Sequence, residues 1–348
     1  MYNNSFSNSF IIQKNSFSFI RLICCLIVIY EHSVALSHSA WINLHLAPFA
    51  VKTFFILSGF WVTFSLLKSS SIKEYTKKRL IKIFPKYWAV IIFTAFSFVF
   101  VSSFSVEKYF LDAVLWKYIF VNFMTLNFLQ PSLPGVFEGL PFEGSVNGAL
   151  WTIKIELCFY LFLPIIIFIL FKVKEKLKCK NGESMILIII FISSVCFSCV
   201  VDYFCLHYNL SQSLKTLFPA FLTYFISGMI FCLYWRMIEK NLNKIILPSF
   251  VLLFLINYFN IQIVSYIITP ITLSIIIIWF ATRLVFLEKI THCDYSYEMY
   301  LVHYPLVMLF VQFKFFENNF CLALLSVIGL TFLFSYVLKR IFESIFKL

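Results

Sequence analysis

An imidazole lies inside the first long apolar run of this chain. His32 falls within residues 19–36, next to Glu31 and eleven residues after Arg21. At about 100° per residue, Arg21 and His32 lie on one helical face, roughly 16 Å apart along the axis. Ionisable side chains are costly inside a membrane and are functional candidates there. We therefore expect a cation at one membrane boundary and, near mid-depth, a catalytic histidine that accepts a proton from a hydroxyl.

A second ionisable group is predicted at a similar depth. Glu156 lies about seven residues into the apolar run 149–171. A carboxylate beside His32 would orient the imidazole and make it a better base, so we expect Glu156 to assist catalysis. Glu31 could take this part instead, or pair with Lys52. The alternative is a structural pair that holds two membrane spans together.

A run of cations follows the second apolar stretch. It contains Lys73, Lys77, Lys78, Arg79, Lys82 and Lys86. Arg79 and Lys82 are three residues apart and therefore share a helical face. Such a face suits a phosphate-rich ligand or anionic lipid headgroups, and Arg21 could add to the same anion site. The alternative is a topology signal without a ligand.

Two further groups mix polar and aromatic side chains. Asn147, Trp151 and Tyr160 lie around a predicted outer interface, where aromatic rings anchor a protein or stack on sugars. Tyr300 and His303 lie in the apolar run 296–313. We expect these five residues to bind substrate, with packing as the alternative for His303.

Composition defines the fold class. Of 348 residues, 61% are hydrophobic and 13% charged, and the apolar runs are continuous. A soluble domain could not bury so much apolar surface, so we predict an all-α polytopic membrane protein. About ten transmembrane helices are expected, near 19–37, 48–67, 85–105, 149–171, 185–205, 215–235, 245–260, 262–282, 296–313 and 319–338.

The net charge of +12 does not indicate nucleic-acid binding, because 22 of the 28 Lys and Arg residues fall on one side of the predicted membrane. This positive-inside pattern places both termini in the cytoplasm. Residues 1–18 are then a cytoplasmic tail. Residues 106–148 form an extracytoplasmic region, with a re-entrant or interfacial helix over 108–129 and a Pro/Gly-rich loop that cannot continue a helix. We expect one membrane domain over 1–348 and no metal site.

Five stretches, in this order, resemble motifs of the acyltransferase 3 family of integral membrane acyltransferases. They are residues 21–32, 54–60 (FFILSGF), 78–88 (KRLIKIFPKYW), 150–160 (LWTIKIELCFY) and 296–303 (SYEMYLVH). The family's Arg-x-x-Arg pair corresponds to Arg79 and Lys82. Lysine keeps the charge but lacks the planar fork of arginine.

The resemblance implies ten transmembrane helices in the bacterial cytoplasmic (inner) membrane. It implies transfer of an acyl group, usually acetyl, from cytoplasmic acyl-CoA to a hydroxyl of a cell-surface glycan or its lipid-linked precursor. His32 would be the essential histidine, acting as a base or as the carrier of the acyl group. Arg21, Arg79 and Lys82 would hold the donor phosphates. No SGNH-type hydrolase domain is expected.

Two other classes of function were weighed against this one. A transporter or flippase of a charged or lipid-linked substrate would also use ionisable residues near mid-membrane. The sequence has neither the inverted repeats nor the matching Gly/Pro-broken helices common in transporters. A membrane scaffold without catalysis would have no use for His32.

Overall fold

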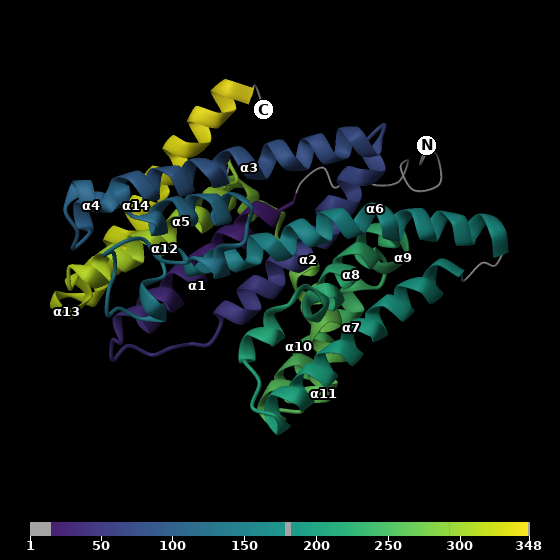
Figure 1. Ribbon diagram of the computed structural model, residues 1–348. Helices are drawn as coiled ribbons and strands as arrows, with labels where there is room; N and C mark the ends of the chain where they lie inside the picture. Colours follow the sequence, from purple (N-terminus) through teal and green to yellow (C-terminus); the bar gives the residue numbers. More distant parts are fainter. Residues whose placement is uncertain (1–14, 178–181, 292, 347–348) are drawn as a thin grey trace. The chain divides into compact units, whose positions relative to one another are not determined.

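The computed structural model describes residues 15–177, 182–291 and 293–346. Throughout these ranges the chain forms helices joined by turns and loops, with no β-strand (Figure 1). Helices satisfy their backbone hydrogen bonds internally, which an apolar environment requires. The all-α prediction is confirmed. Most of the predicted cytoplasmic tail, residues 1–14, lies outside the described ranges.

Nine helical segments among the described residues are long and apolar enough to cross a membrane. Their α-helices are α1 (Phe17–Ser37), α2 (Ala47–Lys68), α3 (Ile72–Ser97), α6 (Trp151–Leu177), α7 (Gly182–His207), α8 (Phe218–Leu233), α10 (Leu242–Phe259), α11 (Gln262–Arg283) and α14 (Phe320–Phe346). The remaining predicted span forms α12 (Ser296–Gln312), which has 17 residues. That length is at the lower end of the roughly 17–25 residues of transmembrane helices. The polytopic membrane fold is therefore confirmed.

Four short helices complete the described chain. Helices α4 (Val106–Leu111) and α5 (Ala113–Phe123) occupy the stretch predicted as an interfacial helix. The break between them is at Asp112, whose side chain accepts a hydrogen bond from Val114 N and caps α5. The other two are α9 (Trp235–Glu239) and α13 (Phe315–Asn318).

Helix α3 begins thirteen residues before the predicted span 85–105. Hydropathy detects only the apolar part of a helix, whereas Lys, Arg and Glu are good helix formers and extend it beyond the apolar part. Pro85 lies inside α3 and does not end it. Arg79 and Lys82 therefore lie on one helix, as their spacing predicts.

The loop over 130–148 interrupts the helices, as its Pro and Gly content predicts. Gly135, Gly139 and Gly144 have φ angles of 64°, 75° and 68°. This left-handed region is accessible to glycine at little cost and is incompatible with a right-handed helix. The loop closes on itself where Val146 N donates to Pro131 O over 2.9 Å.

The chain divides into two compact units, each built from separated stretches of sequence. The first comprises the described parts of Met1–Ile20, Val51–Lys77 and Ile155–His292. The second comprises those of Arg21–Ala50, Lys78–Lys154 and Cys293–Leu348. The boundary of one membrane domain over 1–348 stays a prediction.

In the first unit, α2 and α8 cross at two glycines. A Cβ atom on Gly59 would lie 2.0 Å from the carbonyl oxygen of Phe225, and one on Gly228 would lie 2.0 Å from that of Ile56. Small residues allow membrane helices to approach this closely. Gly59 belongs to the 54–60 stretch, so close helix packing gives that stretch a structural reason.

We expect Gly59→Ala to destabilise the protein, because no side-chain movement relieves a contact with a backbone oxygen. Overpacking of this kind costs about 1–3 kcal/mol. Thermal unfolding of the purified protein in detergent measures the loss. Gly329→Ala on α14 is the matched control, since nothing lies within 4 Å of its Cβ position. Equal unfolding temperatures for the two variants would contradict the crossing.

Candidate functional site

Two histidines from opposite ends of the sequence meet in the second unit. Nδ1 of His32 on α1 lies 3.0 Å from Nε2 of His303 on α12. The two ring planes are parallel within 1°. His303 is 1% exposed, whereas His32 is half-buried. Both residues are candidates from the sequence, but they are 271 positions apart, and only the fold brings them together.

The second ring nitrogen of His303 also has partners. His303 Nδ1 lies 3.1 Å from the carbonyl oxygen of Met299 and 3.0 Å from that of Tyr300. Both carbonyls belong to the preceding turn of α12, so the helix itself orients the ring. His303 is thus held on both sides, by its own helix and by His32.

Tyr304 forms another side of the site. Its ring lies edge-on to His32, with centroids 5.2 Å apart and an interplanar angle of 78°. A Cβ atom on Gly148 would lie 2.7 Å from the Tyr304 ring, so glycine leaves the space that this ring needs. Tyr304 is not recognisable as a site residue from the sequence, because a tyrosine in an apolar helix is ordinarily a packing or interface residue.

Asn147 and Tyr300 connect the turn at Gly148–Leu150 to α12. Asn147 Nδ2 donates to Leu301 O over 2.8 Å. The Tyr300 hydroxyl donates to Ala149 O over 3.1 Å and accepts from Thr152 over 2.9 Å. These hydrogen bonds fix the turn that carries Gly148. Substrate binding by Asn147 and Tyr300, and by the half-buried Trp151 at the start of α6, stays a prediction.

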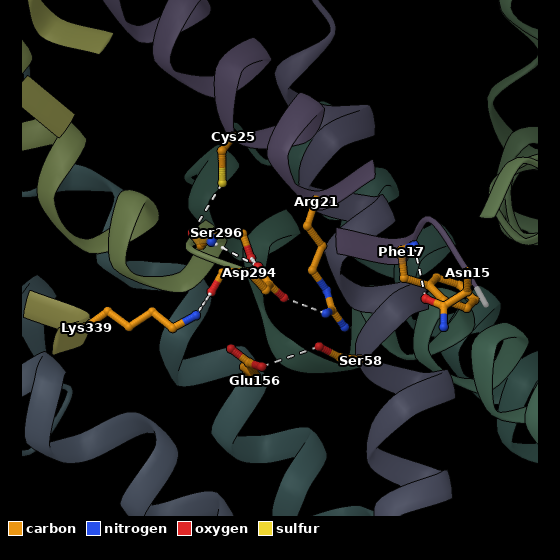
Figure 2. A network of polar contacts seen from close by, with 9 residues as sticks. All are labelled: Asn15, Phe17, Arg21, Cys25, Ser58, Glu156, Asp294, Ser296 and Lys339. Carbon is orange, nitrogen blue, oxygen red and sulfur yellow. Dashed lines mark hydrogen bonds and ion pairs between the residues drawn. The ribbon is translucent and has the colours of Figure 1, made fainter. Parts of the chain in front are cut away.

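Arg21 has an acidic partner that the sequence analysis did not identify. Its Nη1 atom lies 2.8 Å from Oδ2 of Asp294, just before α12 (Figure 2). Lys339 Nζ donates to the Asp294 carbonyl oxygen over 2.7 Å. Asp294 Oδ1 accepts from the backbone and hydroxyl of Ser296, so the same carboxylate also contacts the first residue of α12.

The charge of Asp294 is firmly maintained. Burial opposes ionisation, but Arg21, Ser296 and Lys82 outweigh it and hold the pKa of Asp294 at about 2. Because this value lies below the roughly 3.9 of an unfolded aspartate, ionised Asp294 stabilises the fold above about pH 4, and this contribution is lost as pH falls toward 2. Arg21 and Lys82 thus act on one carboxylate. Arg79 lies on the same helix as Lys82 and is half-buried.

A buried ion pair joins α3 to α12 in the second unit. Lys86 Nζ contacts Oε1 of Glu298, and the two residues are 8% and 2% exposed. The Tyr297 hydroxyl donates to Ile83 O over 3.1 Å beside it. The sequence analysis counted Lys86 in the cationic run. In the sequence, its partner Glu298 stands out only as a member of the 296–303 motif.

Glu156 and Tyr160 belong to the first unit. Glu156 Oε1 accepts from the Tyr160 hydroxyl and, over 3.4 Å, from that of Ser58 on α2 (Figure 2). The Tyr75 hydroxyl donates to Tyr160 O over 3.2 Å. His32 belongs to the other unit, so its predicted pairing with Glu156 stays a prediction.

Glu31, the alternative partner of His32, contacts the backbone of the second unit. Its Oε1 accepts from Leu46 N over 3.2 Å. Assistance of His32 by Glu31 stays a prediction. Within 15–177, 182–291 and 293–346, no group of three or more His, Cys, Asp or Glu residues could hold a metal ion.

These features define a helical membrane domain with a histidine pair at its site, and comparison with known proteins identifies its family. A family model described as an acyltransferase domain matches residues 14–340. The chain belongs to this family, acyltransferase 3, which confirms the resemblance seen in its motifs.

Two curated relatives show partial similarity. An O-acetyl transferase of Shigella phage Sf6 is 28% identical over 182 residues, covering 51% of this chain and 50% of the relative. Nodulation protein 10 of Rhizobium leguminosarum bv. viciae is 26% identical over 171 residues, covering 44% of each. The chain thus spans about half the length of the curated relatives it matches. No solved structure matches it.

We expect Lys86→Met to destabilise the protein by about 3–5 kcal/mol, because it leaves the buried Glu298 carboxylate without a cation. Adding Glu298→Gln removes that charge and should restore much of the loss. The measurement is the thermal unfolding temperature of the wild-type protein and of the single and double variants in detergent. A double variant no more stable than Lys86→Met would show that the pair does not carry the effect.

Proposed function

We propose that this protein is a membrane O-acyltransferase, located in the bacterial cytoplasmic membrane. It transfers an acyl group from acyl-CoA to a hydroxyl of a cell-surface glycan or its lipid-linked precursor. The acyl group that we propose is acetyl. The family match over 14–340 carries the proposal. Similarity to a relative named as an O-acetyl transferase supports it.

His32 performs the proton transfer in this proposal. The acceptor oxygen attacks the thioester carbonyl, so that a C–O bond forms and the C–S bond breaks. The hydroxyl proton moves to His32 and then to the departing thiolate, which leaves as free CoA. If His32 instead carries the acyl group, its ring must likewise offer a nitrogen lone pair. Support for His32 comes from its half-buried position and its contact with His303.

The donor phosphates bind Arg21, Arg79 and Lys82. Arginine and lysine form charge-assisted hydrogen bonds with phosphate, and Arg21 and Lys82 already act on the carboxylate of Asp294. A phosphate oxygen and the Asp294 carboxylate are therefore alternative partners for Arg21. No metal takes part in this proposal.

In the second unit, the sugar acceptor contacts Asn147, Trp151 and Tyr300. Amide, hydroxyl and aromatic groups together can hydrogen-bond a sugar and pack against its ring. In the first unit, Tyr160 is likewise proposed to bind substrate, and Glu156 accepts a hydrogen bond from its hydroxyl. Membrane lipids surround the apolar helices.

We expect surface glycans from cells with the wild-type gene to carry an added acyl mass that is absent from a deletion strain. His32→Ala, produced at the wild-type level, should remove it as well, because the acceptor proton then has no base. Mass spectrometry of the purified glycans measures this and identifies the acyl group. Identical masses in all three strains would exclude glycan acylation and favour a non-glycan acceptor or transport.

We expect Lys82→Arg to lower the KM for acetyl-CoA about fivefold. The planar guanidinium adds a hydrogen bond to phosphate worth about 1 kcal/mol. Lys73→Arg, at the exposed start of α3, is the matched control and should leave the KM unchanged. A Lys82→Arg enzyme with an unchanged KM would remove position 82 from the donor site.

A further inference from the structure

The contact between His32 and His303 has the geometry of an in-plane hydrogen bond. The ring centroids are 5.2 Å apart, whereas the facing nitrogens are 3.0 Å apart. Because the ring planes are parallel within 1°, the two nitrogens lie between the centroids. The lone pair and the N–H of an imidazole lie in the ring plane, so one ring donates to the other.

The partners of His303 decide which ring donates. Its Nδ1 faces the carbonyl oxygens of Met299 and Tyr300, at 3.1 Å and 3.0 Å. Carbonyl oxygens only accept hydrogen bonds, so His303 Nδ1 carries a hydrogen. A neutral imidazole has one N–H, which leaves His303 Nε2 as an acceptor.

We propose that His303 is a positioning residue that sets the tautomer of His32. Nδ1 of His32 donates its hydrogen to His303 Nε2, and Nε2 of His32 therefore keeps a lone pair. Hydrogen bonding at one ring nitrogen is a general way to fix the state of the other. The sequence predicts substrate binding for His303, whereas its contact with His32 favours a positioning role.

The assignment specifies the reacting atom, and here it rests on the proposed function. The acceptor O–H bond breaks as an N–H bond forms at His32 Nε2. The resulting imidazolium keeps its Nδ1–H bonded to His303, which stabilises the charge, and then passes the new proton to the CoA thiolate. The reverse tautomer would present N–H to the hydroxyl and could not act as a base.

The tautomer can be measured without any acyl transfer. We would incorporate ¹⁵N-histidine into the full chain in lipid bilayers and record nitrogen spectra at neutral pH. With six histidines in the sequence, the difference from His32→Gln assigns the His32 signals. A protonated Nδ1 and an unprotonated Nε2 are expected. An Nε2–H tautomer at His32, or a doubly protonated His303, would overturn the proposal.

Kinetics test the consequence. His303→Leu removes the acceptor and should lower kcat about 100-fold with little change in either KM. His303→Gln offers a carbonyl oxygen to His32 Nδ1–H and should recover part of that loss. No such recovery is expected if His303 only fills space between the helices. His207→Leu, an exposed histidine at the end of α7, is the matched control. All variants are first compared by thermal unfolding.

The outcomes separate this proposal from the proposed function. If His32→Ala abolishes transfer while folded His303→Leu and His303→Gln retain wild-type kcat, His303 is not a positioning residue but the acyltransferase proposal stands. If the wild-type protein transfers no acyl group, the proposed function fails. The nitrogen spectra then still decide whether His303 sets the tautomer.

Discussion

Helix α12 contains polar side chains in successive turns, and an apolar surrounding offers them no water. Each must therefore find a partner inside the protein. Glu298 pairs with Lys86, Tyr300 bonds to Ala149 O, and His303 bonds to His32. These three contacts join α12 to other segments of the second unit. A shift of α12 along its axis would break them together.

In the proposed mechanism His32 is a base, and a base contributes only when it is held close to reactive geometry. His32 lies on α1, and its orientation depends on His303 and on the edge-on ring of Tyr304. Gly148 leaves room for that ring. In the proposed mechanism, the hydrogen bonds that hold this part of the fold together are therefore also the ones that orient His32 for proton transfer.

The charged groups at the start of α12 also find partners inside the protein. Asp294 accepts from Arg21 and from Ser296, so one carboxylate neutralises a cation and also binds the first residue of α12. Its low pKa keeps this arrangement ionised at the pH of any cell. If Arg21 binds the donor as proposed, a phosphate replaces the Asp294 carboxylate beside the guanidinium, which is then paired both with and without the donor.

Hydropathy and motif order were enough to predict the all-α membrane fold, the apolar parts of the long helices and the family, because each depends on residues close in sequence. Helical spacing likewise placed Arg79 and Lys82 on one helix. The contacts of the site could not be predicted in this way. His32 meets His303, Arg21 meets Asp294 and Lys86 meets Glu298 across more than two hundred residues. A residue's type shows that it needs a partner, but only the packing of the helices decides which partner it has.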